Sequence, residues 1–216
     1  MLTLFGHPFS SYTWKALIAL YANATPFVFR ELRTGNIQTD AFVASAGPSG
    51  QFPVLRDGDI TVFEATSIVE HLHRHHPGPS PLLPKDEATA IRVRMWDRVF
   101  DLHVMNVMQQ AVSRQISEPE IDPSEARSEV RDQLHRSYRW IEKWLAGYIQ
   151  RDKVTLIECA AAPSLFYADW VIPVPCDCPR VKAWREHLLA LPPVARCVEE
   201  ARPYRHLFPL GAPDRD

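Results

Sequence analysis

The chain has 216 residues, 46% of them hydrophobic, which is enough for one large domain or two small ones with real cores. Its net charge of −2 gives no field that would favour nucleic acid or an anionic membrane, and no apolar run reaches the roughly 20 residues of a membrane span. With no signal peptide in view and no spaced framework among the four cysteines, we expect a cytoplasmic protein.

Strands and helices alternate through the first part of the chain. Short apolar runs predict strands at residues 2–5 and 27–32, and helices are expected from about residue 10 to 22 and from 39 to 45. Two further strands flank the tight turn at Asp57-Gly58, and a third helix follows them. Strands joined through a helix should be parallel, and the final hairpin should be antiparallel. This order matches a thioredoxin-like domain.

The segment from Gly50 to Ser67 predicts a receptor for a small peptide. Pro53 has no N–H and restricts Phe52 to an extended backbone, so the N–H and C=O of Phe52 stay free to pair with a peptide alongside. Glu64 precedes the third helix, whose first N–H groups are unpaired and attract a carboxylate. A carboxylate at a helix N-terminus and an amine beside Glu64 together describe an amino-acid head group.

The start of the first helix bears on the chemistry. A thioredoxin-like domain used for redox work needs a cysteine there, but this chain has Ser10-Ser11-Tyr12-Thr13 and no cysteine before Cys159, which excludes disulfide exchange from this position. A hydroxyl can instead donate a hydrogen bond to a thiolate, and the helix N-terminus adds positive potential. Together they lower the pKa of a bound thiol from about 8.5 and make it nucleophilic at neutral pH. The alternative for Ser10 is a plain helix cap.

A proline-rich connector separates this mixed part from a helical part. Four prolines between His76 and Lys85 are incompatible with a helix or a sheet. We therefore expect a thioredoxin-like domain at residues 1–77, a linker at 78–86 and an all-helical domain at 87–216.

The second domain is predicted to be an all-helical bundle. A long helix begins at Glu87 and carries one apolar stripe, formed by Ile91, Met95, Val99, Leu102 and Met105. Asp122-Pro123 starts a second long helix, and two long helices joined by a short break pair antiparallel. Thr155 and Glu158 fit a capping box in front of a small, apolar, central helix. Two shorter helices follow, the last at about residues 194–201.

Two groups of metal-ligand residue types lack the spacing of a metal site. His71 and His75 could share one helix face, but no carboxylate or cysteine completes the set, and histidines at a helix C-terminus complement its dipole. Cys176 and Cys178 lack a third ligand and lie in a loop that starts a helix. We therefore expect solvated side chains and no metal.

Two stretches carry a resemblance to a known family. Gly-Gln-Phe-Pro-Val-Leu from Gly50, followed by Phe-Glu-Ala-Thr-Ser-Ile-Val-Glu-His-Leu from Phe63, resembles the glutathione site of the cytosolic glutathione transferases. The resemblance covers nearly the whole chain. It implies that Pro53 is cis, that the Phe52 backbone pairs with the cysteinyl part of glutathione, and that Gln51 binds the glycine carboxylate.

The same resemblance assigns the other end of the peptide to the start of the third helix. It implies that Glu64 and the next residue hold the γ-glutamyl end of glutathione. Relatives have a serine at that next position, whereas this chain has Ala65. The backbone N–H of Ala65 remains as a donor, with Thr66 or Ser67 as candidates for additional contacts.

The resemblance also selects a residue to contact the thiol. Ser10 lies five residues before Lys15, which is the spacing in serine-type members of the family. Some members have one residue fewer in this stretch, which would point to Ser11, and other classes use a tyrosine hydroxyl, which would point to Tyr12. The loop from Thr34 to Gln38 could supply a further polar contact.

As a whole, the resemblance implies a homodimeric glutathione transferase that uses glutathione as co-substrate and needs no metal. A bound thiolate would attack a small hydrophobic electrophile. We expect one or two residues of an apolar set to face that electrophile, the set being Trp96, Met105, Met108, Phe166 and Trp170. Two alternatives stay open. One is another glutathione-dependent reaction, such as isomerisation, dehalogenation or peroxide reduction; the other is a binding protein without activity, which the missing serine slightly favours.

Overall fold

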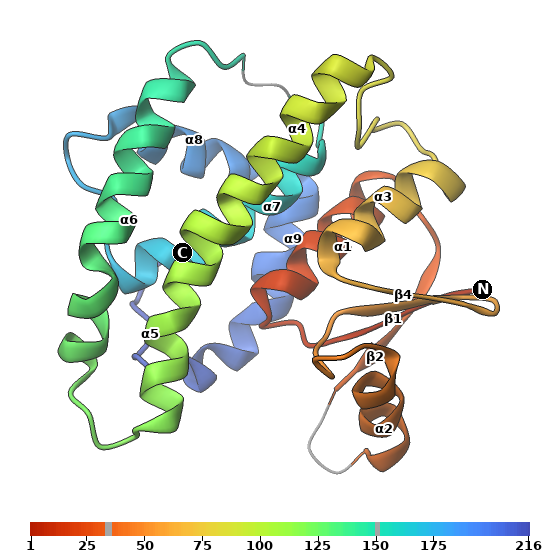
Figure 1. The fold of residues 1–216 in the computed structure, drawn as a ribbon, viewed down its shortest axis with the longest axis horizontal. Coiled ribbons are helices and arrows are strands. Elements are labelled where there is room, and N and C mark those ends of the chain that lie inside the picture. Colours follow the sequence, from red (N-terminus) through yellow and green to blue (C-terminus); the bar gives the residue numbers. More distant parts are fainter. Residues whose placement is uncertain (33–35, 150–151) are drawn as a thin grey trace.

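The computed structural model describes residues 1–32, 36–149 and 152–216, and its first part is built on a four-stranded sheet (Figure 1). The strands are β1 (Leu2–Gly6), β2 (Phe27–Glu31), β3 (Val54–Asp57) and β4 (Ile60–Phe63), in the order β2-β1-β3-β4. Helices α1 (Ser11–Ala22) and α3 (Ala65–His75) lie on one face of the sheet. Helix α2 (Ile37–Ala46) lies on the other, where Val43 packs against Phe5 and Val54. This is the predicted thioredoxin-like arrangement.

One prediction about the sheet is wrong, because β3 runs antiparallel to β1 although a helix connects it to β2. The β1–β2 pair is parallel and the β3–β4 hairpin is antiparallel, as expected. β2 leaves the sheet where Glu31 lies beside Gly6, and β3 enters where Val54 lies beside Phe5, at the same end of β1. The connection through α2 therefore returns the chain to the end of the sheet at which β2 finished, so β3 runs in the opposite direction to β2. A parallel β3 would need a connection that travels back along the strands to the other end of the sheet.

In the second part of the chain, all regular secondary structure among the described residues is helical. Its helices are α4 (Glu87–Phe100), α5 (Asn106–Ser117), α6 (Pro123–Leu145), α7 (Leu156–Val171), α8 (Pro179–Ala190) and α9 (Pro192–Ala201), followed by a 3-10 turn at Arg202–Leu207. α5 and α6 run antiparallel beside each other, as predicted (Figure 1). Residues 76–86, between α3 and α4, form neither helix nor strand. Among the described residues, no helix is long and apolar enough to cross a lipid bilayer.

Local side-chain bonds start two of these helices as the sequence predicts. The Asp122 carboxylate accepts the Ser124 N–H at 2.8 Å at the beginning of α6. In the capping box of α7, the Thr155 hydroxyl accepts the Ile157 N–H at 3.2 Å, and the Glu158 carboxylate accepts the Thr155 N–H at 2.8 Å. Every residue of α7 is buried, so this helix forms the centre of the second part.

A π-helical turn (Asp101–Met105) separates α4 from α5. In this turn the Asn106 N–H donates to the Asp101 carbonyl, five residues earlier. Three members of the apolar stripe predicted for this helix are exposed, namely Ile91, Met95 and Leu102. The buried apolar residues of α4 are Ala90, Val93, Trp96 and Phe100. Since α4 is apolar on two faces, its periodicity alone did not identify the buried one.

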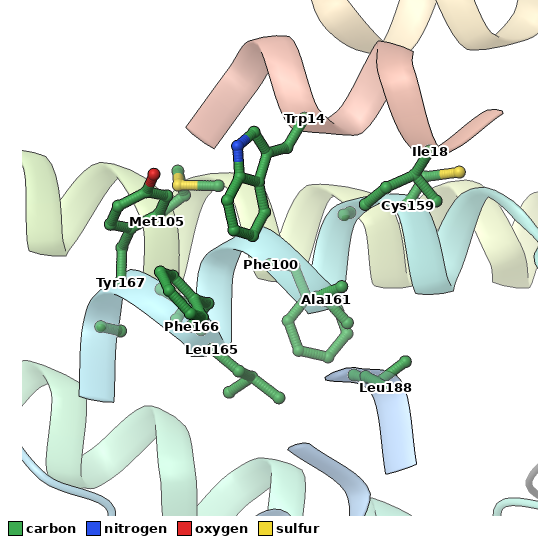
Figure 2. Packing of buried hydrophobic residues seen from close by; sticks show 14 of the residues in the cluster. Trp14, Ile18, Phe100, Met105, Cys159, Ala161, Leu165, Phe166, Tyr167 and Leu188 are labelled. Atoms are coloured by element: carbon green, nitrogen blue, oxygen red, sulfur yellow. The ribbon is translucent and has the colours of Figure 1, made fainter. Parts of the chain in front are cut away.

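The two parts share one hydrophobic core where α1 crosses α7 (Figure 2). The ring centroid of Trp14 lies 4.9 Å from that of Phe166 and 5.4 Å from that of Tyr167. The Trp14 indole N–H donates to the Pro8 carbonyl at 2.6 Å, and the Tyr167 hydroxyl donates to the Phe9 carbonyl at 2.9 Å. The loop before α1 is therefore held by its own helix and by the helical part.

Candidate functional site

A cavity of about 880 Å³ lies between the loops of the first part and the α4–α5 helix. Every residue predicted from the sequence to contact glutathione lines it, apart from the alternate Ser11. The predicted residues on its wall are Ser10, Tyr12, Gln51, Phe52, Pro53, Glu64, Ala65, Thr66 and Ser67. Three segments separated in the sequence thus meet around one space. A place on this wall does not by itself assign a role to any of these side chains.

The turn before β3 presents backbone groups to this cavity. The Phe52–Pro53 peptide bond is cis, and the Phe52 side chain is 38% exposed. No hydrogen bond joins the Phe52 backbone to another described residue. Gly50 has a φ of +61°, a left-handed conformation that favours glycine over other residues. The turn therefore leaves the Phe52 N–H and C=O without a partner among the described residues, as the sequence predicts.

The start of α3 forms a second polar wall. Glu64 precedes the helix with a φ of +67°, and its side chain makes no capping hydrogen bond. Non-glycine residues in this conformation cost about 1–3 kcal/mol and occur mainly at functional sites. The first N–H groups of α3 carry the positive end of the helix dipole. Ser67 is exposed on the same turn, so its hydroxyl is accessible from the cavity.

Thr66 belongs to a buried charge network that joins the two parts of the chain. The fully buried Lys15 ammonium lies 2.5 Å from the Asp97 carboxylate and 2.6 Å from the Asp101 carboxylate. It also donates to the Thr66 hydroxyl at 2.7 Å, and that hydroxyl donates to Asp97 at 2.9 Å. Arg98 donates to the Thr66 hydroxyl at 3.0 Å from the cavity side. The Thr66 side chain is thus engaged by protein groups, which leaves its backbone N–H for a ligand.

Ser10 is the N-cap of α1, and its hydroxyl oxygen accepts the Thr13 N–H at 3.2 Å. The functional and structural alternatives for Ser10 do not exclude each other, because a hydroxyl can accept one hydrogen bond and still donate its proton. No described residue accepts the Ser10 hydroxyl proton. Ser10 therefore caps its helix, and its hydroxyl proton remains able to donate a hydrogen bond to a ligand.

The two alternates to Ser10 differ from it in their surroundings. Ser11 is almost completely buried, and its hydroxyl accepts a hydrogen bond from the Gln109 amide of α5 at 3.3 Å. Burial, followed by the nearby Asp101 and Glu64 carboxylates, raises the pKa of Tyr12 to about 12. The negative field that raises this pKa disfavours a thiolate at Tyr12 and favours an ammonium group.

A second cavity of about 290 Å³ adjoins the first. Its wall is largely apolar and includes Phe9, Met108, Val112, Tyr167, Leu207 and Phe208. Of the five apolar residues proposed to include an electrophile-facing wall, only Met108 lines this cavity. Phe166 and Met105 belong instead to the buried core. Ser10 and Phe52 line both cavities, so the two spaces meet at the N-terminus of α1.

Sequence reasoning missed the wall that α4 and α5 contribute to the larger cavity, which includes Arg98, Asp101, Asn106 and Gln109. A signal for this wall was present in the sequence. Asp97 and Asp101 are four residues apart, and Asp97 lies between the buried Trp96 and Phe100. Two carboxylates on a largely apolar helix need a buried partner, but Lys15, the partner, is far away in the sequence. Of the loop that could have added a contact, residues 34 and 35 lie outside the described residues, and Asn36 caps α2.

At the opposite end of α3, the expectation of solvated histidines is wrong for two of them. Asp57, at the end of β3, bonds to His71 Nε2 at 3.0 Å and to His76 Nε2 at 2.7 Å. The sequence showed no carboxylate near these histidines because Asp57 reaches them through the fold of the hairpin onto α3. Cys178 precedes α8 as predicted, and burial raises its pKa to about 11, which makes it a poor nucleophile.

Comparison with known proteins identifies similar sequences and structures. Residues 4–80 match the family model of the glutathione S-transferase N-terminal domain, and residues 99–192 match that of the C-terminal domain. A glutathione S-transferase of Silene vulgaris is 30% identical over 99 residues, and the alignment covers 44% of this chain and 45% of the relative, less than half of each. Glutathione S-transferase F13 of Arabidopsis thaliana is 26% identical over 207 residues, covering 88% of this chain and 91% of the relative.

The fold also resembles solved structures. A maleylacetoacetate isomerase from Methylobacterium extorquens AM1, crystallised with malonate and GSH bound, is 20% identical and aligns over 99% of both chains with a TM-score of 0.74. At this level of identity the likeness shows a shared fold.

Proposed function

Because this chain belongs to the glutathione S-transferase family by the matches to both of its domains, we propose that it is a glutathione transferase. Glutathione occupies the larger cavity, and a small hydrophobic electrophile occupies the smaller one. The observation that carries this proposal is the position of Ser10, which lines both cavities at the N-terminus of α1. A sulfur atom held there lies beside the space for the second substrate.

The central part of glutathione pairs with the Phe52 backbone, whose N–H and C=O have no partner among the described residues. An extended peptide gains affinity from such backbone bonds, much as a strand adds to a sheet edge. Gln51, on the same wall, binds the glycine carboxylate with its amide. The glutathione-bound isomerase of the same fold is consistent with this use of the cavity.

The γ-glutamyl end lies at the start of α3, where the site offers groups of both charges. The ammonium group is placed beside Glu64 and Asp101, the two carboxylates whose field contributes to the raised pKa of Tyr12. The carboxylate is placed at the α3 N-terminus, where it accepts the Ala65 and Thr66 N–H groups. Arg98 is close to this point and adds a positive charge that the sequence-based interpretation did not include.

Ser10 stabilises the thiolate by donating its free hydroxyl proton to the sulfur, and the dipole of α1 adds to this effect. The thiol proton leaves to solvent as the thiolate forms. The sulfur lone pair then forms a bond to an electrophilic carbon in the smaller cavity, and the displaced leaving group or the added electron pair takes up a proton. No step of this proposed reaction uses a metal ion.

A glutathione-dependent isomerisation is the second candidate. In that reaction the sulfur adds to a double bond and later leaves, and it needs the same thiolate. The isomerase with malonate and GSH bound, which aligns over the full length of this chain, is the observation that keeps this candidate.

A homodimer forms part of the proposal. Large apolar side chains are exposed on α4 and at the start of β4, namely Ile91, Met95 and Ile60. Exposed apolar side chains of this size are compatible with an interface between chains. Sedimentation analysis of the purified protein measures its mass in solution. A cytoplasmic location, which the cysteine usage favours, stays a prediction.

Calorimetric titration with glutathione, followed by a panel of electrophiles, tests the proposed function. We expect saturable binding below millimolar concentration and a conjugation rate with at least one electrophile. Binding without turnover on any electrophile or isomerase substrate would favour a non-catalytic binding protein. Absence of binding at millimolar glutathione would remove both enzymatic candidates.

A further inference from the structure

A cluster of Asp57, His71 and His76 lies away from both cavities. β3 and α3 each begin beside the larger cavity, at Pro53 and Ala65, and each runs away from it. Asp57 ends β3, His71 lies in the second half of α3 and His76 is its C-cap. At 1.5 Å per residue, His71 lies about 9 Å and His76 about 16 Å along the helix from Ala65, and none of the three residues lines either cavity. Any ligand of this cluster is therefore distinct from glutathione.

The three side chains direct ligand atoms at one point. Oδ2 of Asp57 lies 3.0 Å from Nε2 of His71 and 2.7 Å from Nε2 of His76, and all three atoms lie within 4.8 Å of one another. Tetrahedral zinc with ligand distances of about 2.0–2.2 Å requires neighbouring ligand atoms to be about 3.3 Å apart. To admit such an ion, the contacts of Asp57 with His71 and His76 open by about 0.3 Å and 0.6 Å, and the two imidazole nitrogens, which lie within 4.8 Å of each other, take up about the same spacing.

Local structure holds these side chains in place. His76 is the C-cap of α3, and its N–H donates to the Leu72 carbonyl, while its φ of −133° takes it off the helical path. This departure allows its ring to share Asp57 with His71, which lies five residues earlier. Asp57 is positioned by the hairpin turn at Gly58, where φ is +59°. The cluster therefore needs no rearrangement of backbone to gather three ligands.

The electrostatic surroundings suit a cation. The Asp57 carboxylate supplies an anionic ligand within hydrogen-bond distance of both imidazole rings. The C-terminus of α3 contributes the negative end of its dipole. The side chains are 9% exposed for His71, 23% for Asp57 and 30% for His76, which leaves one side open for a water molecule.

We propose that Asp57, His71 and His76 bind a divalent transition-metal ion, with Zn²⁺ as the ion of best fit. Two imidazole nitrogens and one carboxylate oxygen are ligands that zinc accepts, and water takes the fourth position. Mg²⁺ and Ca²⁺ are disfavoured because they prefer oxygen ligands. The ion replaces the two hydrogen bonds to Asp57, and the Nε2 protons of the histidines move to Nδ1. It fastens the β3–β4 hairpin to the end of α3, directly before the proline-rich connector.

Zinc titration of the full-length protein tests this proposal. The protein carries no affinity tag, is first treated with a chelator, and is titrated with zinc chloride by calorimetry without glutathione, because the thiol would compete for the ion. We expect one ion per chain with a micromolar or lower Kd. At a hundredfold excess over Kd, the melting temperature should rise by about 5–10 °C. Weak surface sites bind zinc with a Kd on the order of 100 µM, so absence of binding at 100 µM zinc would overturn the proposal.

Matched variants separate this site from adventitious binding by surface histidines. His76→Gln and Asp57→Asn should each weaken zinc binding by at least about 100-fold. His73→Gln changes a histidine of the same helix that does not contact Asp57, and it should bind zinc as the wild type does. His75 is unsuitable as a control because its ring centroid lies 4.6 Å from that of His71. Retention of binding in both ligand variants, or its loss in His73→Gln, would contradict the assignment. Melting curves without zinc identify any variant that fails to fold. If one ligand variant does not fold, zinc binding by the other ligand variant tests the assignment.

Discussion

The Tyr167 hydroxyl on α7 donates a hydrogen bond of 2.9 Å to the carbonyl oxygen of Phe9, the residue before Ser10. A side chain from the helical part thus holds the backbone beside the hydroxyl that we assign to the thiol. Burial raises the pKa of Tyr167 well above its ordinary value, so the donor keeps its proton at any working pH. The placement of Ser10 consequently depends on packing between the two parts of the chain.

Tyr167→Phe should lower both stability and turnover. The change leaves the Phe9 carbonyl without its donor, which costs about 1–2 kcal/mol and lowers the melting temperature by about 2–8 °C. We expect kcat to fall while the Kd for glutathione changes little, because the groups that hold the peptide stay in place. Tyr21→Phe removes a similar bond, of 2.7 Å to Glu200, away from both cavities. An equal loss of kcat in that control would contradict the positioning role of Tyr167.

Removal of the Ser10 hydroxyl should move the acid limb of the pH–rate profile upward. If the bound thiol has its pKa lowered by two units, kcat/KM at pH 7 falls by at most about 25-fold in Ser10→Ala, and the limb moves toward pH 8.5 by the share of the shift that the hydroxyl contributes. The alanine variant also loses a helix cap, which costs about 1 kcal/mol, whereas Ser10→Gly loses only a few tenths. The same kinetic loss in both variants would assign it to the hydroxyl rather than to the cap.

Variants of the two alternates complete this experiment. With a pKa of about 12, Tyr12 stays protonated up to pH 10, so it gains no charge that could produce a limb in the working range. Tyr12→Phe and Ser11→Ala should therefore leave the acid limb where it is in the wild type. A shift of the limb in either of them, with none in Ser10→Ala, would transfer the thiol contact to that residue.

Ala65→Ser should strengthen glutathione binding. The substitution adds a hydroxyl at the first position of α3, beside the proposed place of the γ-glutamyl carboxylate. One added hydrogen bond is worth about 0.5–1.5 kcal/mol, so the Kd from calorimetry should fall about 2- to 10-fold. Ser67→Ala gives the complementary measurement, since a loss of affinity there would show that Ser67 already supplies a hydroxyl. An unchanged or weaker Kd in Ala65→Ser would place the carboxylate elsewhere.

Lys15→Met should destabilise the protein strongly. Lys15 is fully buried between Asp97 and Asp101, and its removal takes the cation from Asp101 and leaves Asp97 with Arg98 alone among the described residues. Loss of one partner from a buried ion pair costs about 3–5 kcal/mol, which for a chain of this size lowers the melting temperature by about 6–20 °C. Lys143→Met, at an exposed position on α6, is the control and should change the melting temperature by less than about 2 °C. A small effect at Lys15 would mean that the network contributes little.

The features that sequence reasoning predicted correctly depend on few neighbouring residues. Asp122 caps its helix, and Thr155 and Glu158 form a capping box, because each bond spans at most three residues. The hairpin at Gly58 follows from one residue that accepts a positive φ. The order of elements, and with it the thioredoxin-like part followed by helices, is built from such local signals.

The features that it missed join residues far apart in the chain. Lys15 meets Asp97 only after α1 and α4 have both packed against α7, and Asp57 meets His76 only after the hairpin folds onto α3. The direction of β3 was mispredicted for the same reason, since the path of the connection through α2 is set by tertiary packing. The residues proposed for glutathione were located through a motif, whereas Arg98 has no motif and is identified only by its place on the cavity wall.

The number of residues in the π-helical turn between α4 and α5 sets how α5 is rotated relative to α4. Asp101 and Asn106 both line the larger cavity although five residues separate them. In an uninterrupted α-helix, steps of about 100° per residue would put their side chains roughly 140° apart. Deletion of one residue in the turn would rotate α5 by about 100° against α4, so that Lys15 and Ser11 could not both keep their partners Asp101 and Gln109. Substitutions in this turn are tolerable where packing allows, whereas an insertion or deletion separates the two halves of the cavity wall.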